Sequence, residues 1–208
     1  MPTTLISNLL KSDRLFSIDS DDLVRYNRKA KDPYRLHPEL GSSAYEGDID
    51  TASLVLLLAN PGFNETSTHQ DHTFQVAGWP LAGLHPDAPL GLRTWWHARL
   101  KWLIQEFGAQ HVSKSVACLQ LTPWASSKFD ESLRLPSRKL FLEAANRCAE
   151  RGAVMLVMRG ERFWLQAEVL NATQKRFRVN SWRSSYVSPG NISSDGWHAI
   201  TRALRSAR

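Results

Sequence analysis

Residues 54–64, LVLLLANPGFN, contain the apolar run Leu54–Leu58 and, one residue later, the turn sequence Asn60-Pro61-Gly62. An unbroken apolar run of this length between turn residues is typical of a strand that is buried on both faces of a parallel sheet. A buried helix shares this apolar character, but Pro61 and Gly62 follow too soon for a helix to form. The segment therefore predicts a central strand of an α/β fold.

Asn60 stands just beyond the carboxyl end of this predicted strand. In open α/β sheets ligands bind beyond the carboxyl ends of the strands, and an asparagine offers them both a donor and an acceptor. Pro61 fixes its own φ, and Gly62 lets a ligand approach the backbone or takes a positive φ. Asn-Pro-Gly is also ordinary turn chemistry, so this segment taken alone favours a plain strand-ending turn.

The composition is that of a globular protein with one domain. The 208 residues are 42% apolar and 22% charged, and a chain of this length buries roughly 70% of its unfolded surface. No apolar run approaches the ~20 residues that span a bilayer, and the first residues, MPTTLISNLLKSDR, lack the pattern of a signal peptide. We therefore expect a cytoplasmic, monomeric protein with no membrane partner.

Several cofactor and metal classes have no matching motif in this chain. Cys118 and Cys148 are too few for a disulfide framework or a four-cysteine metal site. His69 and His72 lie close together, but no third ligand falls at metal-binding spacing. No glycine-rich phosphate loop follows the first strand and no G-x-S-x-G elbow occurs, which argues against dinucleotide binding, nucleoside triphosphate hydrolysis and an α/β-hydrolase. We expect no metal and no cofactor.

The positive charge is concentrated at the C-terminal end of the chain. The net charge is +6, and residues 175–208 contain seven Lys and Arg residues but only one acid, Asp195. A basic region of this kind attracts a polyanion such as nucleic acid. The alternative is a solvated surface whose charges do not gather in one place.

Apolar strand patterns alternate with helical patterns through the rest of the chain, which predicts a single α/β/α domain with a central, mostly parallel four-stranded sheet. We interpret residues 1–50 as an N-terminal arm packed on a core of residues 51–208. Residues 60–92 are predicted to be a long irregular loop. The expected strands are 54–58, 116–121, 153–158 and 177–179, and the expected helices are 23–29, 94–107, 140–151, 161–170 and 197–205.

Three segments that follow these strands have distinctive sequences: Ala59–Asn64, Gln120–Trp124 and Val187–Asn191. Together with the order of the elements, they resemble the uracil-DNA glycosylase superfamily. In that superfamily a loop after the first strand carries Asp or Asn before Pro, and a final loop precedes the last helix. The Asn60-Pro61-Gly62 sequence is most similar to the loop of the mismatch-specific and single-strand-selective branches. The resemblance covers roughly residues 50–208.

The resemblance implies hydrolysis of the N-glycosidic bond of uracil or another deaminated base in DNA. Asn60 would orient the attacking water, because an amide is not a strong general base. Phe63 would stack on a flipped-out base, although a core position is equally expected for this residue. Gln120 or Thr122 would contact an edge of the base. The remaining implied contacts are to substrate, from Pro61, Gly62, Asn64, Ser188, Pro189, Gly190 and Asn191, and to phosphates, from Arg183 and Arg202.

One departure from the superfamily separates two hypotheses. Many of these enzymes have a histidine in the last loop, where this chain has Val187-Ser188-Pro189. That histidine would stabilise the negative charge on the departing base, and losing one such donor costs on the order of 100- to 1,000-fold in rate. The retained Asn60 favours a DNA glycosylase. The missing histidine favours a non-catalytic protein that binds nucleic acid or a nucleotide in the same cleft.

Overall fold

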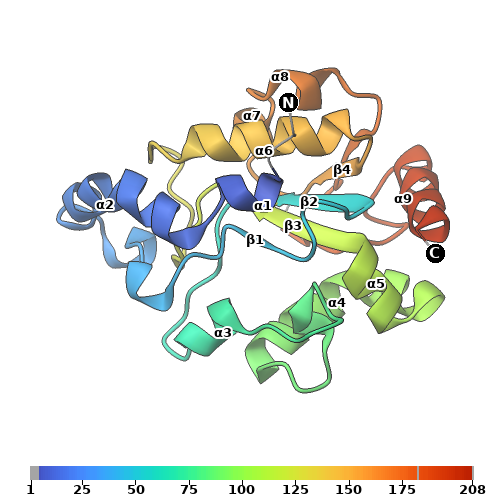
Figure 1. Cartoon of the computed structure of the whole chain (residues 1–208), viewed down its shortest axis with the longest axis horizontal. Helices are drawn as coiled ribbons and strands as arrows, with labels where there is room; N and C mark the ends of the chain where they lie inside the picture. The colour runs from blue at the N-terminus through green and yellow to red at the C-terminus, as the bar shows by residue number, and fades with distance from the viewer. Residues whose placement is uncertain (1–4, 182, 208) are drawn as a thin grey trace.

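The computed structural model describes residues 5–181 and 183–207, and its centre is a mixed sheet of five strands in the order β1-β3-β2-β4-β5 (Figure 1). Strands β2 to β5 are parallel to one another, and β1 pairs antiparallel with β3 at one edge. The strands are β1 (Tyr45–Glu46), β2 (Leu54–Leu58), β3 (Val116–Gln120), β4 (Val154–Val157) and β5 (Arg176–Arg178).

The prediction of three apolar strands side by side at the centre is confirmed. Strand β2 pairs with β3 on one side and with β4 on the other, so that Leu56 lies opposite both Cys118 and Leu156. The predicted four-stranded sheet is wrong in one respect, because β1 adds a fifth, antiparallel strand. Two residues between Gly41 and Gly47 carry no period-2 pattern, so this short strand had no sequence signal.

Helices surround the sheet and include several that the sequence pattern did not predict. The N-terminal helix α2 is much longer than the predicted 23–29, residues 161–172 form two short helices in place of one, and the predicted loop 60–92 contains α3. The helices are α1 (Ile6–Leu9), α2 (Ser12–Asn27), α3 (His69–Thr73), α4 (Leu90–Phe107), α5 (Ala109–Ser115), α6 (Arg138–Glu150), α7 (Glu161–Trp164), α8 (Glu168–Ala172) and α9 (Ser194–Ser206), with 3-10 turns at Asp32–Tyr34, Pro38–Leu40 and Ala82–Leu84.

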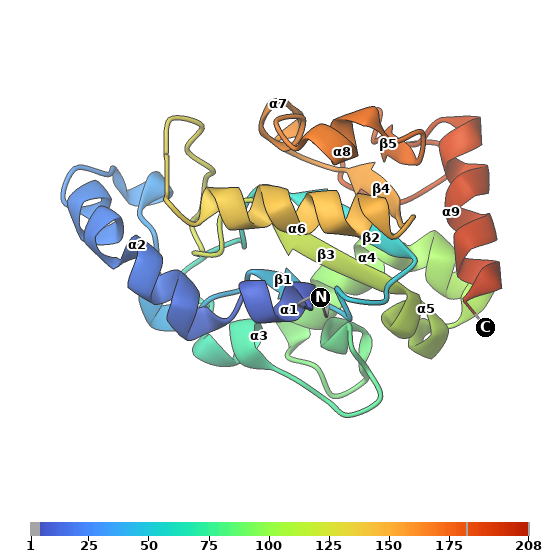
Figure 2. The same ribbon diagram turned by 45° about the horizontal axis from the view of Figure 1, so that its top comes forward.

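Alternate side chains of the strands pack into two separate cores, one on each face of the sheet. Leu54, Leu56 and Leu58 of β2 face α4, α5 and α9, whereas Val55 and Leu57 face α6. Figure 1 shows α6 on one side of the strands with α4 and α5 on the other, and Figure 2 shows α9, which contacts β2, β4 and β5. Burial on both faces explains why these strands are apolar without alternation.

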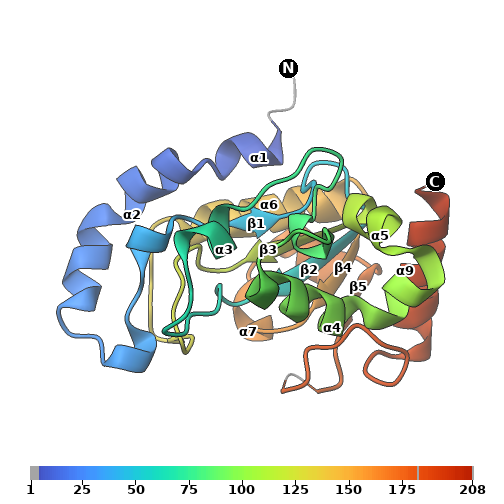
Figure 3. The same ribbon diagram turned by 90° about the horizontal axis from the view of Figure 1, so that it is seen from below.

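The N-terminal segment is part of the core. Ile6, Leu10, Leu15 and Leu23 are all buried in the cluster that also contains Phe141 of α6. Figure 3 shows α1 and α2 along one side of the molecule, with α4 on the opposite side. The expected arm therefore contributes apolar side chains to the core and strand β1 to the sheet.

Asp19 joins this N-terminal segment to the rest of the core. Its carboxylate is fully buried and accepts hydrogen bonds from the Trp124 indole Nε1 (2.9 Å), the Ser137 hydroxyl (2.6 Å) and the Ser137 N–H (3.0 Å). Ser137 directly precedes α6, so a negative charge lies at the positive end of that helix. The three donors replace the water that the buried carboxylate loses.

We predict that Asp19→Ala lowers the free energy of unfolding by roughly 3 kcal/mol, because it leaves the buried Trp124 and Ser137 donors without an acceptor. Urea unfolding of the purified variant measures this change. Asp21→Ala is the matched control, since Asp21 lies on the same helix but is exposed; its expected change is within about 0.5 kcal/mol. Equal stability of the two variants would show that α2 is not anchored through Asp19.

Candidate functional site

A cleft of about 1010 Å³ opens at the carboxyl edge of the sheet. The ends of β2, β4 and β5, the loop after β3 and one face of α4 form its walls, in agreement with the general position of ligand sites in open α/β sheets. Hereafter it is called the main cleft. Its lining consists of residues 58–60, 62, 126–129, 157–162 and 178–180 together with Tyr34, Trp95, Arg99, Glu131 and Ser185.

Asn60 lines the main cleft, and its side chain is held in one orientation. Its Nδ2 group donates to the Ser126 carbonyl (3.0 Å), the Ser126 hydroxyl (2.9 Å) and the Pro61 carbonyl (2.9 Å). Carbonyl oxygens only accept, so this end of the amide must be the nitrogen. The Ser126 hydroxyl in turn donates to the Lys128 carbonyl (3.0 Å). Among the hydrogen bonds of the described residues none involves Oδ1, which leaves this oxygen as an acceptor for a ligand or water.

The residues after Asn60 have different environments. Pro61 is buried, whereas Gly62 is exposed, lines the main cleft and has a negative φ, so a left-handed turn is not why glycine stands there. Phe63 lies outside the cleft lining and stacks on His37, with ring centres 3.6 Å apart and an angle of 12° between the planes. One face of the Phe63 ring is therefore already covered. Asn64 is exposed and its Oδ1 accepts from Thr66 N–H (2.9 Å), a local turn contact.

Gln120 and Thr122 are buried near the end of β3 and are not part of the cleft lining. Gln120 is 5% exposed and lies opposite Leu58 in the sheet, on the face that packs against α4. Its Oε1 has no hydrogen-bond partner among the residues that the structure describes. A buried acceptor without a partner is uncommon in folded proteins and needs an explanation. Thr122 is held by its backbone, whose N–H donates to the Ala59 carbonyl (3.0 Å).

In the last loop, Asn191 has a structural role. Its Nδ2 donates to the carbonyls of Ser184 (2.6 Å) and Tyr186 (2.9 Å), and its Oδ1 accepts from Ser181 N–H (2.8 Å). The whole amide is thus occupied in holding residues 181–191 together. Ser188, Pro189 and Gly190 are not in the lining of the main cleft, and Ser185, three residues before Ser188, is the member of this loop that lines it.

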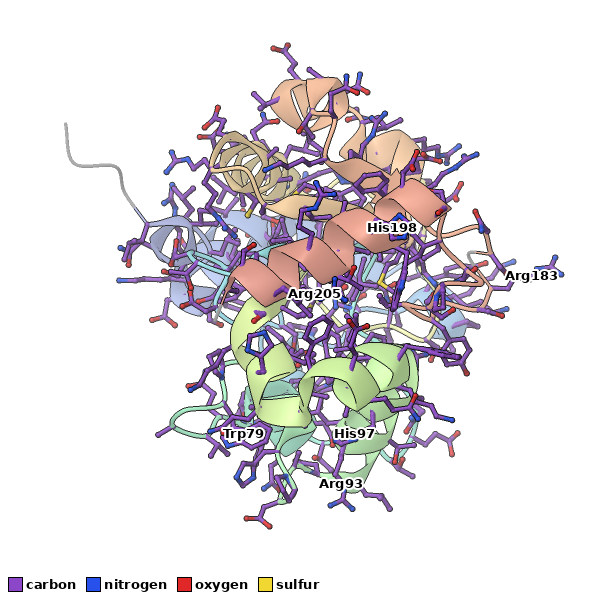
Figure 4. All side chains as sticks on the ribbon, turned by 90° about the vertical axis from the view of Figure 1, so that its right-hand side faces the viewer. Trp79, Arg93, His97, Arg183, His198 and Arg205 are labelled. Atoms are coloured by element: carbon purple, nitrogen blue, oxygen red, sulfur yellow. The ribbon has the colours of Figure 1, made fainter. Side chains whose placement is uncertain are left out.

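The two arginines expected to contact phosphates also lie outside the main cleft. Arg202 is exposed on α9, and Figure 4 shows Arg183 projecting away from the body of the protein. His198, the nearest histidine in sequence to the last loop, is exposed on α9 (Figure 4). Of the basic residues in the C-terminal region, Arg178 lines the main cleft, whereas Arg183 and Arg202 do not.

The basic residues around the main cleft are mostly ones that sequence reasoning missed, and Arg178 is the member that belongs to the basic C-terminal region. Five basic and two acidic side chains line the cleft, so positive charge is in excess there. Arg159 lies two residues beyond β4, as Asn60 lies two residues beyond β2, and the same strand-end rule could have identified it. Arg178 ends β5, and the other three come from segments that had no such signal. The basic set is Arg99, Lys128, Arg159, Arg162 and Arg178, and the acids are Glu131, which pairs with Arg162, and Glu161, which pairs with Arg178 (3.3 Å).

A second hollow of about 560 Å³ lies beside β1 and is lined by Glu46 and His72. The Glu46 carboxylate accepts from the Trp96 indole Nε1 (2.8 Å), and burial raises its pKa to about 7. Burial lowers the pKa of His72, whose Nδ1 lies 2.9 Å from the Ser43 hydroxyl. Glu46 therefore changes charge near neutral pH, and both groups lie outside the lining of the main cleft.

No family model, curated protein or solved structure matches this chain. Among residues 5–181 and 183–207, no group of three His, Cys, Asp or Glu side chains is arranged to hold a metal ion. Every helix in the same part of the chain is too short or too polar to cross a membrane. Chemical interpretation of the main cleft thus depends on its own residues.

We predict that Glu46→Gln changes the pH dependence of stability. The folded state raises the pKa of Glu46 from 4.5 to about 7. The protonated carboxyl therefore contributes stability to the folded protein that is fully present below about pH 4.5 and is lost as the pH rises through 7. The glutamine keeps an acceptor for Trp96 without a charge. We subtract the unfolding free energy of wild type from that of the variant at each pH. This difference should be roughly 2 to 3 kcal/mol larger at pH 8 than at pH 5.

Urea unfolding at the two pH values measures this gain. Glu150→Gln serves as the control, because Glu150 is exposed at the end of α6. If Glu46→Gln and wild type differ by the same amount at pH 5 and pH 8, the Glu46 carboxylate is not desolvated.

Proposed function

We propose that this protein is a monofunctional DNA glycosylase that hydrolyses the N-glycosidic bond of uracil or another deaminated base, a reaction of DNA repair. The observation that carries the proposal is Asn60. It lies at the carboxyl end of the central strand, in the main cleft, with its Nδ2 fixed by Ser126 and Pro61. A fixed amide with an available Oδ1 is suited to hold a water molecule at one point in a cleft.

The reaction requires a water, a place for the base and contacts to DNA. Water attacks C1′ of the sugar, the C1′–N bond breaks, and the electron pair of that bond leaves with the base. Oδ1 of Asn60 accepts a hydrogen bond from the water and orients its lone pair, while the proton of the water passes to solvent or to the departed base. Positioning of this kind reduces the entropy that the attack must lose.

Gln120 supports the proposal as a contact to the base. Its buried Oε1 has no partner, and it lies at the end of β3, the strand beside β2. An amide can pair with both a donor and an acceptor on the edge of a uracil ring. A small movement of α4 would be needed for a base to reach Gln120, because this side chain is not part of the cleft lining.

The size and charge of the main cleft fit a nucleotide better than a neutral metabolite. About 1010 Å³ accommodates a flipped-out nucleotide with its phosphates. The excess of basic side chains attracts the DNA backbone, and the rings of Trp95 and Phe129 in the lining offer faces for stacking. Parallel strands that deliver Asn60-Pro61-Gly62 to this edge agree with a uracil-DNA glycosylase-like fold.

The alternative is a non-catalytic protein that binds nucleic acid or a nucleotide in the same cleft. The stack of Phe63 on His37 favours this alternative, because it occupies one face of the ring expected to hold the base. The positions of Ser188, Pro189 and Gly190 outside the cleft lining favour it as well. Both hypotheses use the same basic cleft, so binding alone does not separate them.

We predict base release from oligonucleotides that contain uracil, hypoxanthine or xanthine, in single- and double-stranded form, detected as strand scission after alkali. Asn60→Ala should lower the single-turnover rate by roughly 100- to 1,000-fold, because the water is no longer held. Asn8→Ala is the control, since Asn8 is exposed on α1, away from the main cleft.

Two results would contradict the proposal. Wild-type protein that is folded and binds the oligonucleotides but releases none of the bases would establish the binding hypothesis. Activity that is equal in wild type and Asn60→Ala would place the reaction elsewhere.

A further inference from the structure

Arg99 lines the main cleft and contains a buried polar atom whose hydrogen bonding is incomplete. It lies on α4 with its Cζ 3.9 Å from the centre of the Trp95 ring, and its Nη1 donates to the Trp95 carbonyl (3.1 Å). Its Nε is enclosed by the protein and has no hydrogen-bond partner within residues 5–181 and 183–207. A guanidinium has five N–H donors, and the hydrogen bonds of the described residues use one of them.

The charge of Arg99 is likewise not balanced by an acid. Both acidic side chains in the cleft lining are paired with other arginines, Glu131 with Arg162 and Glu161 with Arg178. Burial lowers the pKa of Arg99, the neighbouring Tyr186 opposes this change, and the positive charge of Arg159 adds to it. Arg99 and Arg159 both line the main cleft, and no ion pair of the described residues involves either of them, so this part of the cleft stabilises an anion.

The backbone fixes the position of Arg99 against the last loop. The carbonyl of Arg99 accepts a hydrogen bond from the N–H of Val187 (2.9 Å). Its side chain therefore starts beside the last loop and lines the same cleft as Asn60, which belongs to the first loop. The Cζ atom of Arg99 lies over the Trp95 ring, and a guanidinium is planar, so its donors share one plane, which suits a planar acceptor.

We propose that Arg99 is a catalytic residue that donates hydrogen bonds to the departing base and stabilises it as an anion. This inference rests on the proposed glycosylase function and names the group that balances the charge formed in that reaction. As the C1′–N bond breaks, its electron pair moves onto the base and spreads to the ring oxygens. The Arg99 guanidinium stays protonated throughout and donates hydrogen bonds to the negatively charged base. Water supplies the oxygen that bonds to C1′.

The choice of a planar base anion over a phosphate follows from the surroundings of Arg99. Its guanidinium is partly buried and stacked on an indole, whereas a phosphate is tetrahedral and strongly hydrated. Arg162 and Arg178 are more exposed in the structure, at 65% and 71% of their side-chain surface, and are better placed for the DNA backbone. A desolvated cation is worth most against a charge that develops during the reaction.

Leaving-group dependence tests this role. Arg99→Gln should lower the single-turnover rate for uracil by roughly 100- to 1,000-fold, and the loss should be about tenfold smaller for 5-fluorouracil, whose more acidic ring needs less stabilisation as an anion. Arg99→Lys should retain part of the rate because it keeps the charge. The control is Arg93→Gln, on the same helix but outside the cleft lining (Figure 4). An equal loss for both bases would assign Arg99 a merely structural role.

Direct binding separates failure of this inference from failure of the proposed function. At pH 7.5 the free base 5-nitrouracil is an anion and uracil is neutral, and calorimetry compares their affinities without requiring catalysis. Wild type should bind 5-nitrouracil at least about tenfold more tightly, and Arg99→Gln should abolish this preference while its thermal unfolding stays cooperative. Wild type with no preference for the anion overturns the role of Arg99 even if base release is observed. An Arg99-dependent preference without base release upholds the anion site and refutes the glycosylase.

Discussion

The structure depends on the pairing of β2 with a parallel strand on each side. Leu54–Leu58 are all buried, and the strand is hydrogen bonded to β3 and β4 along its length. A strand enclosed in this way cannot shift its register without exposing leucines to water, which costs about 2 kcal/mol or more for each side chain. The carboxyl ends of three strands are therefore fixed at one edge. The backbone of the residues that follow these strands, including Asn60 and Arg159, is therefore held in a defined position.

The N-terminal segment completes the face of the sheet that α6 alone does not cover. Helix α1 supplies the buried Ile6, α2 supplies Leu15 and Leu23, and β1 pairs with β3 at the edge. Asp19 links α2 to Trp124 and to the start of α6 through three hydrogen bonds. Trp124 lies in the loop after β3 that continues to Ser126, the residue that holds Asn60. The buried carboxylate and the candidate water-binding amide thus rest on the same loop.

Polar groups in the main cleft and beside it differ in how far the protein satisfies their hydrogen bonds. Asn60 is useful because its hydrogen-bond donors are satisfied by the protein, which leaves one oxygen for a ligand. Arg99 and Gln120 have the reverse property, since each has a buried polar atom without a partner. Unsatisfied groups reduce stability, and they are concentrated at sites where a ligand later supplies the missing contact. The third such group, Nε of Arg138, lies on α6 against Phe163.

The sequence by itself determined the parallel centre of the sheet and the position of Asn60 at its carboxyl edge. Apolar runs such as Leu54–Leu58 and the turn residues that end them are local signals, because a strand buried on both faces must be apolar wherever it lies. Helix ends such as Gly108, with a positive φ, were also readable from the chain. Tertiary structure decided the rest. It stacked Phe63 on His37, engaged Asn191 within its own loop, and brought Ser126 and Arg99 to the cleft. Apart from those of Asn191, these contacts join residues that are far apart in sequence, so only the packed fold determines which side chains meet and which remain without a partner.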